Sequence, residues 1–266
     1  SPNKVIKFIE LVMSKQIDLI VNWMRVGFIH GVMNTDNSTI CGETIDYGPC
    51  AFMDSYDHKA VFSSIDFQGR YAYGNQPATI HWNLVRLTES LLPLIDKDES
   101  KSLEVAQSTI DSFSNIFNKE WQNMMRLKLG LTDQSEEDEE LIKGLLSWMQ
   151  SKKPDFTNTF ANLMDINHVN DEEFEENDFV EWKKNWKERV NNKDYLNIMK
   201  KTNPILIPRN SLVEEALHEA ETIGKLDKFN ELNKVIASPY NIEKAPKKYL
   251  DTPKKSNIPY KTFCGT

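Results

Sequence analysis

Oxygen-bearing side chains gather in one short stretch of the sequence, between His30 and Asp46. Asn37 stands seven residues after His30, and Asp46 follows nine residues after Asn37. An amide oxygen and a carboxylate are hard ligands of the kind that hold Mg²⁺ against nucleotide phosphates, with phosphates and water completing the shell. Asp36, directly before Asn37, is a carboxylate that can act as a base or orient a hydroxyl group. The stretch therefore predicts metal-dependent chemistry on a nucleotide.

The spacing matches the catalytic region of protein-kinase-like enzymes, where H-x-D-x-x-x-x-N is followed by a short hairpin and then Asp-Phe-Gly. Asn37 falls at the metal-binding asparagine, and Asp46 begins an Asp-Tyr-Gly element at the second metal-binding position. We expect two very short strands over residues 38–46, on either side of a turn at Cys41-Gly42-Glu43, to connect the two elements.

One position departs from that pattern. Val32 stands two residues after His30, where an active kinase carries its catalytic aspartate, and valine cannot accept a proton. Ordinary phosphoryl transfer is therefore not expected, and the pattern is typical of a pseudokinase in which Asp36 is the carboxylate left in the loop. Ordinary turn chemistry is the alternative for Asp36 and Asn37, since Asn and Asp favour loops. For His30 we expect a buried architectural role.

The segments that carry these residues resemble the SelO family. The string from Gly27 to Asn37 and the string from Thr44 to Pro49 are the most specific. The resemblance continues over residues 66–73, 76–77, 82–84, 203–204, 208–210 and 264–266, and so spans essentially the whole chain.

The resemblance implies a protein adenylyltransferase, which binds ATP in an inverted pose and transfers AMP to Ser, Thr or Tyr hydroxyls of other proteins. By motif position Asp36 would be the catalytic acid or base, while Asn37 and Asp46 would hold Mg²⁺, with Mn²⁺ as the alternative. The implied partners are ATP and protein substrates. The loss of the usual aspartate at Val32 is consistent with an inverted nucleotide, because the base then has to serve the α-phosphate.

Three cysteines are present, too few for a disulfide scaffold and without metal-finger spacing. In this family the C-terminal cysteine, or selenocysteine in some members, suggests redox chemistry. We therefore expect either a redox-sensitive disulfide between Cys50 and Cys264 or free thiols. Cys41 is expected to be a small core residue.

Apolar periodicity predicts a mainly α-helical protein. The expected helices cover residues 5–28, 78–94, 101–129, 136–152, 156–163, 172–192, 195–201 and 212–226, and an extended strap follows from Pro239. The acidic run at 135–140 should open a helix, and Trp182 and Trp186 should pack on one helix face. We expect a protein-kinase-like C-terminal lobe over residues 1–95, and a family-specific helical extension with an extended tail over residues 96–266.

The family's N-terminal lobe, with its Gly-rich phosphate loop and nucleotide-gripping lysine and glutamate, is not found in this sequence. We therefore expect the 266 residues to be the second half of a longer protein and to be inactive, or nearly so, alone. Two other functions stay open. One is a non-catalytic pseudokinase scaffold, against which the retained metal ligands weigh. The other is a small-molecule phosphotransferase, against which Val32 weighs.

Composition argues against several classes of protein: nucleic-acid-binding, membrane-spanning and secreted. The formal net charge of −8 argues against a dedicated nucleic-acid surface. No apolar run approaches the length that spans a bilayer, and the first residues lack the layout of a secretory signal. An intracellular protein is expected, cytoplasmic if bacterial and mitochondrial if eukaryotic.

Overall fold

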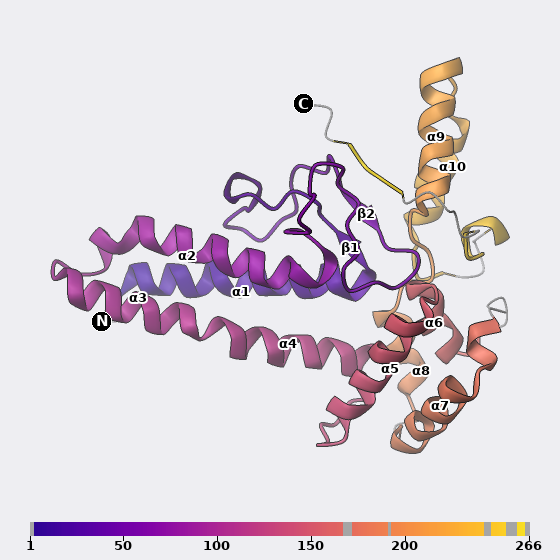
Figure 1. Ribbon diagram of the computed structural model, residues 1–266, viewed down its shortest axis with the longest axis horizontal. Helices are drawn as coiled ribbons and strands as arrows, with labels where there is room; N and C mark the ends of the chain where they lie inside the picture. The colour runs from indigo at the N-terminus through magenta and orange to yellow at the C-terminus, as the bar shows by residue number, and fades with distance from the viewer. Residues whose placement is uncertain (1–2, 167–171, 191–192, 242–245, 254–259, 264–266) are drawn as a thin grey trace.

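The structure is a computed structural model that describes residues 3–166, 172–190, 193–241, 246–253 and 260–263. Over these ranges the chain is mainly helical, with one two-stranded antiparallel sheet. Long helices lie side by side as one layer, the sheet and its loops cover one end of that layer, and shorter helices gather beyond it (Figure 1). None of the helices in these ranges combines the length and apolar character needed to cross a membrane.

The helices and strands are, in chain order, α1 (Lys4–Val26), β1 (Phe28–Ile29), η1 (Thr35–Asn37), β2 (Ala51–Phe52), η2 (Tyr73–Asn75), α2 (Gln76–Ile95), α3 (Glu99–Asp111), α4 (Phe113–Lys128), α5 (Asp138–Lys152), α6 (Phe156–Leu163), η3 (Glu172–Glu175), α7 (Asn177–Arg189), α8 (Tyr195–Thr202), α9 (Asn210–Ile223), α10 (Asp227–Ile236) and η5 (Lys247–Tyr249).

α1 is the helix that leads into the candidate site. It begins after Asn3, whose side-chain oxygen accepts hydrogen bonds from the backbone N–H groups of Val5 and Ile6. It ends where Gly27 adopts a left-handed conformation with φ of 73°, a common way to terminate a helix. The helix predicted over residues 5–28 is thus confirmed, two residues shorter at its C-terminal end. Its apolar face packs against α2 and α4.

The helix predicted over residues 101–129 is divided in two. Ser112 separates α3 from α4, and its hydroxyl donates a hydrogen bond to the carbonyl of Thr109 at 2.6 Å. Serine that bonds back to the preceding turn interferes with the regular helix. α3 then packs on α2 and α4 on α1, across the expected boundary at residue 95. One hydrophobic cluster includes side chains from both parts, and the division into two domains stays a prediction.

The strands predicted over residues 38–46 are wrong. The hydroxyl of Thr39 accepts a hydrogen bond from the N–H of Glu43 at 2.9 Å and donates one to its carbonyl at 2.7 Å. The side-chain amide of Gln16 donates to the carbonyl of Thr39. Side chains therefore satisfy backbone groups that a strand ladder would use, and the segment is a turn. The strands of the structure, β1 and β2, lie on either side of it.

The remaining helix predictions hold within a few residues, as α2, α5, α6, α8 and α9, while residues 172–192 contain both η3 and α7. α10 was not predicted. The acidic run opens α5 as expected. Trp182 and Trp186 stack at 6.3 Å on α7, and Trp186 is fully buried, which confirms their packing role. The described part of the tail is extended only locally, because η5 forms a short helical turn.

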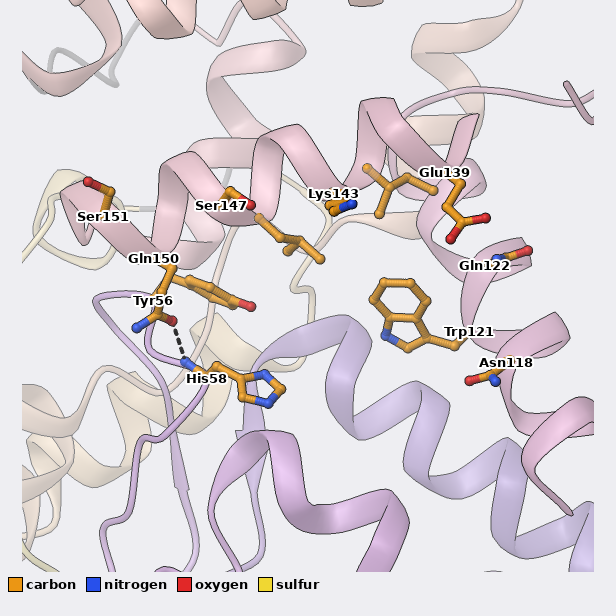
Figure 2. A pocket seen from close by; sticks show the side chains of 12 residues that line it. Tyr56, His58, Asn118, Trp121, Gln122, Glu139, Lys143, Ser147, Gln150 and Ser151 are labelled. Carbon is orange, nitrogen blue, oxygen red and sulfur yellow. Dashed lines mark hydrogen bonds between the residues drawn. The ribbon is translucent and has the colours of Figure 1, made fainter. Parts of the chain in front are cut away.

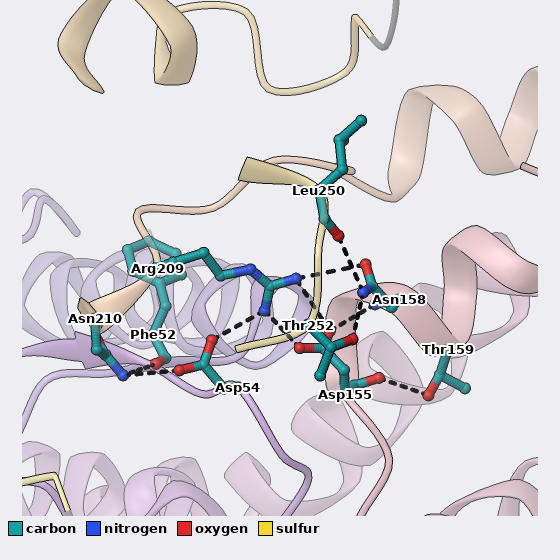
Figure 3. Close-up of polar contacts among 9 residues, drawn as sticks. All are labelled: Phe52, Asp54, Asp155, Asn158, Thr159, Arg209, Asn210, Leu250 and Thr252. Carbon is teal, nitrogen blue, oxygen red and sulfur yellow. Dashed lines mark hydrogen bonds and ion pairs between the residues drawn. The ribbon is translucent and has the colours of Figure 1, made fainter. Parts of the chain in front are cut away.

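A buried ion cluster joins three distant segments (Figure 3). The guanidinium of Arg209, just before α9, lies 2.9 Å from Asp54 and 2.5 Å from Asp155. Asp155 also caps α6, accepting a hydrogen bond from the N–H of Asn158 at 2.8 Å. Burial by itself would lower the pKa of Arg209, but the carboxylates of Asp155 and Asp54 outweigh it and raise that pKa. Arg209 therefore stays charged and holds the segment after β2 against α6 and α9.

We expect Arg209→Met to lower the free energy of unfolding by about 3–5 kcal/mol, because the substitution leaves the buried carboxylate of Asp155 without its counter-charge. Urea denaturation followed by circular dichroism measures the change. The matched control is Arg86→Met, whose ion pair with Glu89 is exposed, and which should cost at most about 1 kcal/mol. Equal costs for the two variants would show that the buried cluster is not a major source of stability.

Candidate active site

The two strands hold the ends of the loop that carries the predicted site residues. Phe28 pairs with Phe52 and Ile29 with Ala51 in antiparallel register. Residues 30–50 therefore form a loop whose two ends lie next to each other at the sheet. The outgoing limb follows β1, the returning limb leads into β2, and this small sheet fixes both. One hydrogen bond, from the N–H of Met53 to the carbonyl of Gly27 at 2.8 Å, extends the pairing.

His30 is fully buried and joins the two limbs. Its Nδ1 accepts a weak hydrogen bond from the N–H of Val32 at 3.4 Å, which leaves Nε2 to donate to the carbonyl of Ile45 at 2.7 Å. Its backbone N–H donates to the side chain of Gln76 on α2. Burial lowers the pKa of His30, against the opposing effects of the Ile45 carbonyl and the charge of Asp46. The expected architectural position of His30 is confirmed, since a neutral ring serves as a fixed connector.

Asp36 and Asn37 share the single turn η1. Asp36 is exposed, whereas Asn37 is half-buried and its amide nitrogen donates to the carbonyl of Val32 at 3.0 Å. That bond fixes the amide so that its oxygen is the atom left for a ligand. Val32 is buried, so the position of the kinase base faces the core rather than solvent.

A tyrosine that the sequence did not single out anchors this turn. The hydroxyl of Tyr71 donates to the side-chain oxygen of Asn34, the residue before η1, at 2.6 Å. Burial raises the pKa of Tyr71, Arg70 opposes the shift, and the carboxylates of Asp66 and Asp36 add to it. The carboxylate of Asp36 thus lies close enough to Tyr71 to disfavour loss of the phenol proton. Tyr71 lies within segment 66–73, one of those that resemble the SelO family, but nothing in the residue spacing linked that segment to the turn.

Asp46 lies on the returning limb, exposed, with a left-handed backbone of φ 54°. Few residues other than glycine adopt this conformation, and aspartate is among the more tolerant. Its carboxylate influences both His30 and Cys50 electrostatically, so it lies near the start and the end of the loop. The structure brings Asp36 and Asn37 together on one turn and places Asp46 on the opposite limb of the same loop.

The donor set fits a metal that is shared with phosphates. Among the described residues, no group of three or more His, Cys, Asp or Glu side chains is arranged to hold a metal by itself. An amide oxygen and one carboxylate supply two hard ligands and leave the other positions of an octahedron to phosphate and water, as Mg²⁺ at a nucleotide requires. The metal-binding roles of Asn37 and Asp46 stay predictions.

Of the two predictions about the cysteines, one is untested and the other is wrong. Cys50 is half-buried, and its thiol donates to the carbonyl of Tyr47 at 3.1 Å. Burial raises the pKa of Cys50, its own backbone opposes this, and Asp46 adds to it, so the thiol stays protonated at neutral pH. Cys264 lies outside the described residues, and the expected pairing is untested. Cys41 was expected in the core, which is wrong, because it sits exposed on the turn after Thr39.

The described end of the chain reaches this region. The hydroxyl of Thr262 donates to the carbonyl of Pro49 at 2.7 Å, and Thr262 pairs with Ser63 in an isolated parallel bridge. The last described residues therefore run beside the segment that contains Cys50.

One cavity lies away from the loop. It measures about 750 Å³ and opens between residues 56–58, α4 and α5, with Tyr56, Trp121 and Glu139 around it (Figure 2). None of the predicted site residues lines it. This cavity therefore does not mark the candidate site, which rests on the chemistry of the loop.

The chain matches the family model described as "Protein adenylyltransferase SelO" over residues 1–237. It is 51% identical over 272 residues to "Protein nucleotidyltransferase YdiU" of Clostridium perfringens strain SM101, covering 100% of this chain and 55% of the relative. It is 47% identical to proteins of the same name from Pelagibacter ubique, covering 100% of this chain and 56% of the relative, and from Bacillus cereus strain AH820, covering 99% and 55%. The chain thus spans little more than half the length of these relatives.

The backbone of Gly31 lies close to that of Pro49, which leaves no room for a larger residue at position 31. Gly31 has φ of 85°, and a Cβ there would lie 2.7 Å from the carbonyl oxygen of Pro49. Gly31→Ala should lower the free energy of unfolding by at least about 2–3 kcal/mol, because it adds a clash to backbone strain. The control is Gly224→Ala, which has φ of 66° but nothing within 4 Å of an added Cβ, and should cost only about 1 kcal/mol. Equal values in urea denaturation would show that the approach to Pro49 is easily relieved.

Proposed function

We infer the function of this chain from its family: the chain belongs to the SelO protein adenylyltransferases, and we propose that it carries the catalytic loop of an enzyme that transfers AMP from ATP to protein hydroxyl groups. The observation that supports the proposal most is the turn η1, where Asp36 is exposed and Asn37 half-buried, beside a buried Val32. The chain spans about 55% of its relatives' length, and the activity is proposed for the longer protein.

In the proposed reaction the hydroxyl oxygen of a Ser, Thr or Tyr side chain attacks the α-phosphorus of ATP. A bond forms between these two atoms as the bond from the α-phosphorus to the oxygen bridging the β-phosphate breaks, and pyrophosphate leaves. Asp36 accepts the hydroxyl proton, a role that its exposed position on η1 allows. Tyr71 holds the turn in place through Asn34.

Asn37 and Asp46 would hold the divalent metal, Mg²⁺ or Mn²⁺. When bound, the metal neutralises phosphate charge and orients the phosphates. The chain contributes the position of both ligands: the carbonyl of Val32 fixes the amide of Asn37, and His30 fixes the peptide beside Asp46.

We further propose that α1, the loop and α2 correspond to the C-terminal lobe of a kinase-like fold. The support is the helix that leads into the catalytic loop, together with hydrogen bonds between α2 and the backbone of that loop and of β1. Gln76 accepts from the N–H of His30 and donates to the carbonyl of Phe28, and Asn83 donates to the carbonyl of Met33. The named relatives are bacterial, and of the two compartments expected we propose the bacterial cytoplasm.

Labelled ATP tests the reaction. A protein of the relatives' full length that contains this chain should transfer label to a protein acceptor from α-labelled ATP and not from γ-labelled ATP, and EDTA should abolish the transfer. Asp36→Asn, Asn37→Ala and Asp46→Asn should each lower the rate by about 10²-fold or more. The control Glu104→Gln changes an exposed carboxylate on α3 and should leave the rate unchanged.

Transfer from γ-labelled ATP would establish a kinase or small-molecule phosphotransferase, and no transfer from either label would favour the scaffold. The 266-residue chain assayed alone should show little or no transfer, because two metal ligands supply few of the contacts that position a nucleotide.

We also propose that Cys50 and Cys264 form a redox-sensitive disulfide. The support is the contact between Thr262 and Pro49, which places Thr262 beside the segment of Cys50. After oxidation, alkylation of the unfolded chain should modify one cysteine, and prior reduction should raise the number to three. Cys41→Ser should lower both numbers by one, whereas Cys50→Ser should make them equal. Alkylation of all three cysteines after oxidation would contradict the pairing.

A further inference from the structure

A cleft of about 930 Å³ borders residues 58–75, which lie between β2 and α2. Lys261 and Phe263, in the last described part of the chain, complete its lining. The cleft is therefore formed by two segments that are far apart in sequence, and each of them is joined to the catalytic loop by hydrogen bonds.

The first segment is joined to the outgoing limb of the loop. The carboxylate of Asp66 accepts hydrogen bonds from the N–H groups of Arg70 and Tyr71, at 2.9 Å and 2.8 Å, and these bonds close a turn. The hydroxyl of Tyr71 donates to Asn34, the residue before η1, at 2.6 Å. The turn that borders the cleft is thus bound directly to the turn that carries Asp36.

The second segment is joined to the returning limb. Two backbone hydrogen bonds of 2.9 Å pair Thr262 with residues 62–64. Thr262 is buried, and its hydroxyl donates to the carbonyl of Pro49 at 2.7 Å. Because side chains alternate along an extended segment, Lys261 and Phe263 point to the other side, and both line the cleft.

Each segment exposes one large aromatic ring. Phe67 is 92% exposed and Phe263 is 74% exposed, and both line the cleft. Val61 and Ala72 add apolar surface to the same lining. Single exposed apolar residues are common, but apolar surface gathered in one cleft with a polar rim is typical of a contact with another molecule. The lining therefore suits a partner that supplies a large apolar side chain.

Charge identifies the rest of the partner. Lys59 and Lys261 line the cleft, and neither forms an ion pair among the described residues. The one carboxylate in the described lining is that of Asp66, and both of its oxygens already accept hydrogen bonds from backbone N–H groups. The cleft thus has an excess of positive charge on a chain whose formal net charge is −8, so it attracts negative groups that the chain as a whole repels.

We propose that this cleft binds an acidic segment of the acceptor protein. One large apolar side chain of that segment contacts Phe67 and Phe263, and its carboxylates lie near Lys59 and Lys261. The proposal rests on the proposed function, because acceptor proteins are the partners which that function implies. A segment bound in the cleft is held by the same residues that position the turn of Asp36, so the choice of acceptor depends on side chains outside the catalytic loop.

Binding of synthetic peptides to the full-length protein tests the proposal without relying on AMP transfer. One fluorescent peptide contains a central Phe among glutamates and a serine, and a second has glutamines in place of the glutamates. Fluorescence anisotropy should show the acidic peptide binding at least about tenfold more tightly, by a margin that shrinks as salt is raised. Equal binding of the two peptides, or no binding of the acidic peptide, would overturn the proposal.

Charge reversal locates the binding. Lys59→Glu combined with Lys261→Glu should remove the preference for the acidic peptide. The matched control, Lys97→Glu combined with Lys119→Glu, makes the same change in net charge at exposed positions outside the cleft. It should keep the preference within about twofold, because charges far from the bound peptide are screened. An equal loss in both double variants would show that overall charge sets the preference, and the proposal would fail.

A cycle of substitutions tests the apolar contact. Phe67→Ser should weaken binding of the acidic peptide several-fold, and so should replacement of the peptide's Phe by Gly. The two changes together should weaken binding by less than the product of the separate effects, because both remove the same contact. Fully independent effects would overturn the contact with Phe67.

Transfer from α-labelled ATP distinguishes this proposal from the proposed function. If the acidic peptide binds as expected and no acceptor receives label, the docking cleft holds and the proposed reaction fails. If the acidic and glutamine peptides receive label with the same KM, the reaction holds and the docking cleft fails.

Discussion

The hydrogen bond from the buried ring of His30 to the carbonyl of Ile45 determines the geometry of the candidate site. It fixes the peptide next to Asp46 against the point where the loop leaves β1. Because the ring is buried and its pKa lowered, it remains neutral and keeps one tautomer, with Nε2 as donor. The exposed carboxylate of Asp46 thus rests on an uncharged internal support, and the charged groups of the loop remain at the surface.

This support is itself held from both sides. α2 reaches the loop through Gln76 and Asn83, which bond to backbone groups before and after His30. The segment after β2 is fastened by Asp54 to Arg209, which in turn holds the cap of α6. Helices late in the sequence, α6 and α9, therefore stabilise a loop that lies near the N-terminus of the sequence. The buried cluster fixes α6 and the start of α9 at the end of the layer where the sheet lies (Figure 1).

The sequence predicted most helices because apolar periodicity is a local property, and α1, α2 and α5 end close to where the pattern ends. It failed where side chains compete with the backbone. Thr39 closes a turn where strands were expected, and Ser112 interrupts a helix whose apolar pattern continues. The spacing of Asn37 and Asp46 placed both on one loop, but Tyr71 could not be foreseen, since its contact with Asn34 joins residues 37 positions apart. Cys41 looked apolar in isolation, yet the turn exposes it.

The contact between Thr262 and Pro49 has a consequence for the order of folding. The two residues are 213 positions apart, and a chain synthesised from its N-terminus makes Pro49 long before Thr262. α1, the loop and α2 can pack before Thr262 is made, because their contacts with one another, such as that between Gln76 and Phe28 48 positions apart, lie within the first part of the chain. The carbonyl of Pro49 must wait for a partner until nearly all of these residues have been translated. The site region of a nascent chain is therefore assembled early and completed late.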